Sequence, residues 1–118
     1  MITVYGIKNC DTMQKAMKWL STNKIAFVFH DYKIAGIDKK TINAWLKTIP
    51  LEQVLNKKGT TFRNLSELEK SDCLNSKTAV PLIISKPSLI KRPLWDLGKE
   101  VYVVGFTDAV QQQVLSLK

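Results

Sequence analysis

The sequence has few cysteines, few arginines and no long hydrophobic run. Within its 118 residues no apolar stretch approaches the roughly 20 residues that a membrane-spanning helix needs, so a membrane span is excluded. The N-terminus lacks the basic start and long apolar segment of a secretory signal, so we expect a cytoplasmic protein. Two cysteines are too few for a disulfide scaffold, which leaves catalytic, metal-binding or packing roles for them.

The positive charge is carried almost entirely by lysine. Arg63 and Arg92 are the only arginines among 18 basic residues, and 10 acidic residues leave a formal net charge of +8. A basic surface favours anionic partners. Nucleic-acid recognition, however, favours the planar guanidinium group, and the lysines are spread along the chain. The composition therefore argues against a nucleic-acid module and fits a small anionic ligand or an acidic protein partner.

The hydrophobic pattern predicts an α/β chain. Residues 2–5 and 25–29 have the composition of short strands, and residues 11–23 between them place apolar side chains on one face of a helix. Residues 94–96 and 101–104 flank a Leu-Gly-Lys turn and predict a hairpin, after which a last helix follows. This order indicates a thioredoxin-like fold, with a mixed four-stranded sheet flanked by helices.

The middle of the chain, about residues 36–88, has helical spacing throughout. Asp38 is placed to cap one helix, and Ser66 with Glu69 predicts a capping box at another. Pro81 is tolerated in a further helix only if it lies in the first turn. We expect a single domain, residues 1–118, with a thioredoxin-like core of about 1–35 and 89–118 and an all-helical insertion of about 36–88 between strands two and three.

Cys10 stands between the first predicted strand and the first predicted helix. The N–H groups and the positive dipole end of a helix start both favour a thiolate over a thiol. Lys8 acts in the same direction and Asp11 in the opposite one, so the sign of the net pKa shift stays open. The alternative is a small buried residue, but burial is less natural between Asn9 and Asp11. We therefore expect Cys10 to be a nucleophile.

The positions of the cysteines limit the redox chemistry. A Cys-x-x-Cys centre would place its second cysteine at position 13, where this sequence has Met13, so an internal disulfide of that kind is impossible. A redox cycle then needs an external thiol such as glutathione, or Cys73, which we interpret as a bystander in the core or at the surface. The single histidine, His30, leaves too few ligands for zinc, and we expect no metal site.

Two further segments carry candidate binding groups. Arg92 and Pro93 precede the third strand, at a place where a cis proline often shapes a binding edge. Arg92 would pair with an anionic substrate or stabilise the thiolate, or else lie exposed before the strand. The loop Gly59-Thr60-Thr61-Phe62-Arg63 would hold a carboxylate or an oxyanion, or else form a tight turn that packs its phenylalanine into the core.

Three motifs stand in a fixed order along the chain: YGIKNCDT at residues 5–12, NKKGTTFR at residues 56–63 and IKRP at residues 90–93. Together they resemble the ArsC/Spx family, and among its branches the YffB-like, ArsC-related proteins. The resemblance covers essentially the whole chain. It implies a thioredoxin-like core with a helical insertion, Cys10 as the reactive thiol, and Arg92 followed by a cis Pro93 beside it.

The resemblance also limits the substrate. Arsenate reductases of this family surround the oxyanion with three arginines, whereas here Asn56 occupies the matching position in the helical block and the region of the third reads Val103-Val104-Gly105. Each lost charged hydrogen bond is worth roughly 1.5–3 kcal/mol, so we expect poor or no activity on arsenate. Spx-type regulators usually carry a Cys-x-x-Cys switch, which Met13 removes here.

The function that follows is a single-cysteine thiol reductase with an unknown substrate. The YffB-like branch implies glutathione as co-substrate, with Cys10 attacking an oxidised or electrophilic centre and Arg92 holding a carboxylate of glutathione or of a small anionic substrate. The alternative is a non-enzymatic, Spx-like regulator that binds an acidic protein partner such as RNA polymerase. Length and charge favour a soluble monomer. The supporting binding residues are Lys8, Asn9, Thr12, Thr60, Thr61, Arg63 and Pro93.

Overall fold

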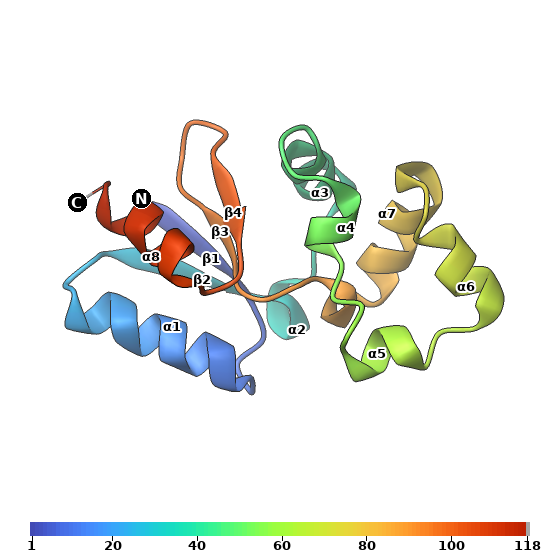
Figure 1. Ribbon diagram of the computed structural model, residues 1–118, viewed down its shortest axis with the longest axis horizontal. Helices are drawn as coiled ribbons and strands as arrows, with labels where there is room; N and C mark the ends of the chain where they lie inside the picture. The colour runs from blue at the N-terminus through green and yellow to red at the C-terminus, as the bar shows by residue number, and fades with distance from the viewer. Residues whose placement is uncertain (118) are drawn as a thin grey trace. The chain divides into compact units, whose positions relative to one another are not determined.

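The computed structural model describes residues 1–117 (Figure 1). The strands are β1 (Ile2–Gly6), β2 (Phe27–Asp31), β3 (Leu94–Asp96) and β4 (Tyr102–Val104). The helices are α1 (Asp11–Thr22), α2 (Tyr32–Ala35), α3 (Lys39–Leu46), α4 (Leu51–Val54), α5 (Thr60–Arg63), α6 (Glu67–Asp72), α7 (Ser76–Ser85), the 3-10 turn η1 (Pro87–Leu89) and α8 (Asp108–Leu115). Contacts divide the chain into an α/β unit, Met1–Ala35 with the chain from Arg92 onward, and a helical unit, Gly36–Lys91.

The α/β unit is built on one mixed sheet with strand order β2-β1-β3-β4. β1 pairs in parallel with β2 and antiparallel with β3, and β3 forms the hairpin with β4. This confirms the predicted mixed four-stranded sheet. The second strand begins two residues later than predicted, at Phe27, because the Ile25 N–H still bonds the Leu20 carbonyl in the turn that ends α1.

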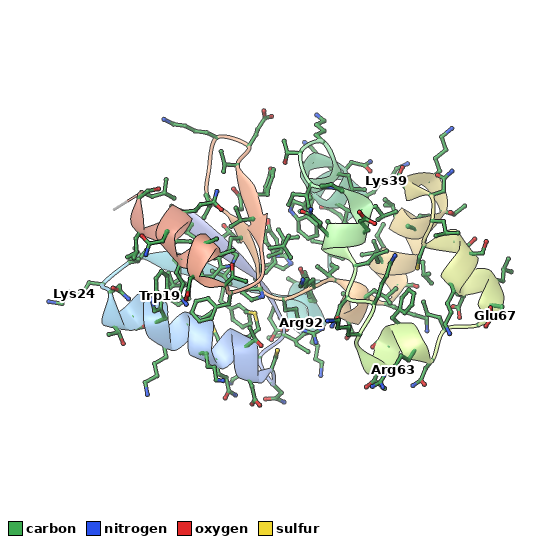
Figure 2. All side chains as sticks on the ribbon, viewed as in Figure 1. Trp19, Lys24, Lys39, Arg63, Glu67 and Arg92 are labelled. Atoms are coloured by element: carbon green, nitrogen blue, oxygen red, sulfur yellow. The ribbon has the colours of Figure 1, made fainter. Side chains whose placement is uncertain are left out.

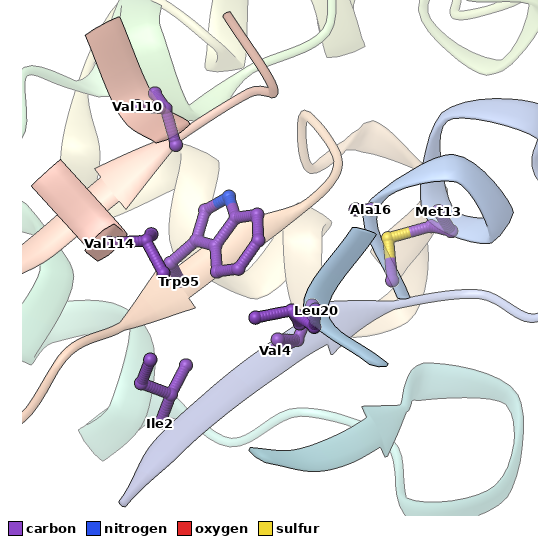
Figure 3. Packing of buried hydrophobic residues seen from close by; sticks show 8 residues of the cluster. All are labelled: Ile2, Val4, Met13, Ala16, Leu20, Trp95, Val110 and Val114. Atoms are coloured by element: carbon purple, nitrogen blue, oxygen red, sulfur yellow. The ribbon is translucent and has the colours of Figure 1, made fainter. Parts of the chain in front are cut away.

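The core of the α/β unit lies between one face of the sheet and the helices α1 and α8. Periodic apolar residues of α1, among them Met13 and Leu20, are fully buried against Val4 of the central strand. Figure 3 shows the Trp95 indole among these side chains, with Val110 of α8 on its other side. Because each of these residues follows the period of its helix or strand, the sequence pattern alone selects the buried face.

The helical unit contains the caps that its sequence predicts. The Asp38 carboxylate accepts a hydrogen bond of 2.8 Å from the Thr41 N–H at the start of α3. At α6 the Ser66 hydroxyl accepts from the Glu69 N–H at 3.1 Å, and the Glu69 carboxylate accepts from the Ser66 N–H at 3.0 Å. Both capping predictions are confirmed, and the second forms a complete capping box.

Two local predictions in this unit are wrong. Pro81 lies inside α7 rather than in its first turn, so the Lys77 carbonyl loses its usual helical donor. Both residues are exposed, so the Lys77 carbonyl is not buried without a partner. The segment from Gly59 to Arg63 is a helical turn and not a loop, because the Arg63 N–H donates a hydrogen bond of 3.2 Å to the Gly59 carbonyl.

Within residues 1–117 no helix is long and apolar enough to cross a membrane.

Candidate thiol site

The sheet brings Cys10 and Arg92 to the same end of the α/β unit. β1 ends at Gly6, and the chain then turns to Cys10, the N-cap of α1. β3 runs antiparallel to β1 and pairs Leu94 with Tyr5, so the chain enters β3 through Arg92 beside the exit of β1. The Arg92–Pro93 peptide bond is cis. Figure 2 labels Arg92 where the chain approaches β3.

Cys10 is placed by the start of α1. Its backbone is extended, with φ −143° and ψ 126°, and its carbonyl accepts the first helical hydrogen bond, from Gln14 at 3.0 Å. Met13, one turn into the helix, is fully buried and packs against Gly6. The residue that replaces a second cysteine is therefore a core residue that fixes the helix start, and with it the position of the thiol.

The surroundings of Cys10 favour its thiolate. Burial is the largest influence and by itself raises the pKa of the thiol, but the Met13 N–H, the Arg92 guanidinium and the Thr12 N–H stabilise negative charge on the sulfur. Together they hold the pKa of Cys10 below its usual range.

Cys73 has the opposite character. It caps the C-terminus of α6 in the helical unit and is 4% exposed. Burial, followed by the negative charge of Asp72, raises the pKa of this thiol, and the ammonium of Lys57 offsets only part of the rise. Both cysteines are free. The surroundings thus favour the thiolate form of Cys10 and the thiol form of Cys73.

Four other residues named from the sequence belong to the same unit as Cys10. Lys8 and Asn9 are exposed in the turn that leads to α1, and Thr12 is exposed in its first turn. Pro93 is buried, and its carbonyl accepts a hydrogen bond of 2.8 Å from the Gly105 N–H. Lys8 also lines a cavity beside the edge strand β2, together with Tyr5 of β1.

The remaining three residues named from the sequence lie together in the helical unit. Thr60, Thr61 and Arg63 all belong to the single turn of α5. Thr60 and Arg63 are exposed, and Thr61 is half-buried. The structure thus gathers them on one short element, with the Arg63 side chain in solvent (Figure 2).

One residue of the α/β unit gave no signal in the sequence. Tyr32 directly follows β2 and is 4% exposed, and its ring lies 6.3 Å from that of Tyr5 and 5.9 Å from that of His30. Burial raises the pKa of Tyr32 well above its usual range, Tyr5 adds to the rise, and the charge of Arg92 opposes it. A single tyrosine after a strand is unremarkable in sequence. Only the parallel register of β1 and β2 places it at the thiol end of the sheet.

Metal chemistry receives no support from the described side chains. Among residues 1–117, no group of three or more histidine, cysteine, aspartate and glutamate side chains is arranged to hold a metal ion. The donor groups at the thiol site are amide N–H groups and a guanidinium, which stabilise anions rather than cations.

Comparison with known proteins decides the family. The profile of the ArsC family matches residues 5–114. The chain belongs to the ArsC family. An uncharacterized protein of Haemophilus influenzae is 44% identical over 94 residues, 80% of this chain and 82% of its own. The global transcriptional regulator Spx of Streptococcus agalactiae is 27% identical over 92% of this chain and 78% of its own.

Solved structures show which members of the ArsC family this chain resembles. A protein named YffB is 43% identical and superimposes with a TM-score of 0.90, over 98% of this chain and 99% of that one. An arsenate reductase (ArsC) related protein from Brucella melitensis is 44% identical, with a TM-score of 0.75 over 97% and 93%. An arsenate reductase from Vibrio cholerae, at 16% identity and a TM-score of 0.75, shares the fold. The predicted ArsC/Spx family, its YffB-like branch and the thioredoxin-like fold class are confirmed.

Proposed function

We propose that this ArsC family member is a single-thiol reductase that uses glutathione as its co-substrate. The observation that carries the proposal is the environment of Cys10, a half-buried thiol at a helix N-terminus whose pKa is lowered by the Met13 amide and by Arg92. A thiolate is the reactive form in disulfide exchange, so these contacts favour attack at neutral pH.

The proposed cycle needs one thiol of the protein and two exchange steps. With a mixed disulfide of glutathione as substrate, the Cys10 thiolate attacks the glutathione sulfur, the disulfide bond breaks and the substrate leaves as a thiolate, which takes a proton from water. A second glutathione, as thiolate, attacks the Cys10 mixed disulfide and releases glutathione disulfide and the Cys10 thiolate. In the net reaction one free glutathione is consumed, the substrate is released as its thiol, and the glutathione that the substrate carried leaves as half of the glutathione disulfide.

Arg92 has two roles in this proposal. Its guanidinium lowers the pKa of Cys10, and it holds a carboxylate of glutathione or of an anionic substrate. Lys8, Asn9 and Thr12 supply further polar contacts from the turn and helix start around the thiol, and Pro93 shapes the edge beside Arg92. Thr60, Thr61 and Arg63, which share the helical turn α5, are proposed as a separate set of polar groups that would bind an anion within the helical unit.

Arsenate is a poor substrate in this proposal. The Val103-Val104-Gly105 segment lies beside the Arg92–Pro93 peptide, since the Gly105 N–H bonds the Pro93 carbonyl. This segment carries no cationic side chain. A tetrahedral oxyanion there would lose the charged hydrogen bonds that further arginines supply, each worth roughly 1.5–3 kcal/mol.

The test follows the mass of the Cys73→Ser protein through one cycle. Incubation with glutathione disulfide is expected to add one glutathione, on Cys10, and added glutathione is expected to remove it. The Cys10→Ser/Cys73→Ser protein, the matched control, acquires none. A Cys10 thiol that forms the adduct no faster than an unstructured peptide thiol would contradict the proposal. An Arg63→Ala variant with unchanged glutathione affinity would remove Arg63 from the candidate binding residues.

A second candidate function is binding to an acidic protein partner. The helical unit exposes large apolar side chains, among them Leu68 at 74% and Leu74 at 79%, on a chain of net charge +8. A relative of this chain is named as a transcriptional regulator. In this alternative Cys10→Ser leaves partner binding intact and charge reversal of surface lysines abolishes it, whereas the reductase requires the opposite result.

A further inference from the structure

The hydroxyl of Tyr32 is buried without a hydrogen-bond partner. The residue is 4% exposed, and among residues 1–117 no group bonds its oxygen. A buried hydroxyl without a partner costs about 1–3 kcal/mol, so one that a structure keeps calls for an explanation, and a group that binds there is one. Phenylalanine would fill the same space without that cost. The hydroxyl therefore requires an explanation that packing alone does not give.

The ring of Tyr32 packs against two aromatic neighbours. It stacks on Tyr5 with an interplanar angle of 20° and a centroid distance of 6.3 Å. It meets His30 edge to face, with an interplanar angle of 63° and a centroid distance of 5.9 Å. Tyr5 and His30 themselves pair across β1 and β2. With the ring oriented in this way, the direction of the hydroxyl is set as well.

The strand register brings Tyr32 and Arg92 to the same end of the sheet. Tyr32 follows Asp31, the partner of Gly6 at the end of β1, and Arg92 precedes the strand in which Leu94 pairs with Tyr5. β2 and β3 flank β1, so the two backbones lie about 9.6 Å apart, two strand spacings, which both long side chains can span. At this separation the charge of Arg92 reaches the Tyr32 hydroxyl and opposes the rise of its pKa.

We propose that the Tyr32 hydroxyl is a second binding group for the anion that Arg92 holds, donating a hydrogen bond to a carboxylate of the substrate or of glutathione. Arg92 is half-buried and the Tyr32 oxygen is covered, so the proposal requires the side chains that cover this oxygen to shift when the anion binds. This inference rests on the proposed thiol chemistry of Cys10 and deepens it by naming a carboxylate as the recognised group.

The test compares two alkylating agents that differ in charge. Iodoacetate carries a carboxylate and iodoacetamide carries a neutral amide, and both report the reactivity of Cys10 in the Cys73→Ser protein. The quantity compared is the rate of alkylation by iodoacetate divided by the rate of alkylation by iodoacetamide. In the Cys73→Ser protein, the parent of the variants below, this ratio is expected to be higher than in an unstructured peptide thiol. Tyr32→Phe is expected to lower that ratio about tenfold, the value of a hydrogen bond to a charged group, while the pH profile with iodoacetamide is unchanged.

Tyr102→Phe is the matched control, because it removes a half-buried phenolic hydroxyl from β4 of the same unit. It is expected to leave the ratio unchanged. A Tyr32→Phe protein that keeps the parental ratio, or a parent without any preference for iodoacetate, overturns the proposal. The proposed function of Cys10 fails in a different way. In that case the pH dependence of alkylation by iodoacetamide shows a pKa of Cys10 that is not lowered. Unfolding of Tyr32→Phe by urea shows that the variant is folded.

Discussion

Gly6 and Met13 leave no room for a side chain between β1 and α1. A Cβ added to Gly6 would collide with the Met13 sulfur and lie 2.7 Å from its Cε. Met13 is fully buried, and the hydrogen bond from its N–H is the largest single contribution among those that lower the pKa of Cys10. The packing of the core and the activation of the thiol thus depend on the same residue.

Gly6→Ala is therefore expected to affect both stability and reactivity. Overpacking a core costs about 1–3 kcal/mol of unfolding free energy, and displacement of the helix start moves the Met13 N–H away from Cys10 and raises the pKa of its thiol. Urea unfolding and alkylation rates measure the two effects. In Gly6→Ala/Met13→Ala the collision is relieved, so the stability losses are expected to be less than additive. Full additivity would mean that the two residues do not interact.

Arg92→Ala is expected to raise the pKa of Cys10 and to slow its alkylation at neutral pH several-fold, because the guanidinium both hydrogen-bonds and attracts the thiolate. Arg92→Lys keeps a charge but loses the planar fork, so its effect is expected to be intermediate. The matched control is Arg63→Ala, which removes the other arginine of the chain. Equal slowing in both alanine variants would assign the effect to net charge.

The lowered pKa of Cys10 also predicts how stability depends on pH. Between the folded pKa and the ordinary thiol value of about 8.5, the unfolded chain binds more protons than the native one, so stability rises with pH. This contribution is complete above about 8.5 and is lost as the pH falls through the folded pKa. The measurement is urea unfolding under reducing conditions at several pH values, on the Cys73→Ser protein and on the Cys10→Ser/Cys73→Ser protein. The difference in unfolding free energy between the two proteins is expected to grow with pH. A flat difference would contradict the electrostatic account.

The capping box of α6 provides a test of the helical unit. Ser66→Ala removes the hydroxyl that accepts from the Glu69 N–H and is expected to lower the unfolding free energy by about 1 kcal/mol. Ser71→Ala, an exposed serine in the same helix, is the control and is expected to change it by less than about 0.5 kcal/mol. Since the thiol lies in the other unit, neither variant is expected to alter the Cys10 profile.

The sequence predicts the parts of this structure that depend on local pattern. The periodicity of Met13 and Leu20, the caps at Asp38 and Ser66, and the position of Cys10 at a helix start all follow from side-chain chemistry at fixed spacing. Pro81 within α7 was missed because the carbonyl that loses its helical donor, that of Lys77, lies at an exposed position, where the loss of one hydrogen bond is tolerated. Tyr32 was missed because its neighbours come from different strands, and only the register of the sheet brings them together.

The most direct test of the central claim is the pH dependence of iodoacetamide alkylation of each cysteine alone, Cys10 in the Cys73→Ser protein and Cys73 in the Cys10→Ser protein. The structure predicts that Cys10 titrates below about 8.5, the ordinary value of a thiol, and that Cys73 titrates above it and reacts far more slowly. A Cys10 thiol that titrates at or above that value would contradict the account of Cys10 as the activated nucleophile of this protein.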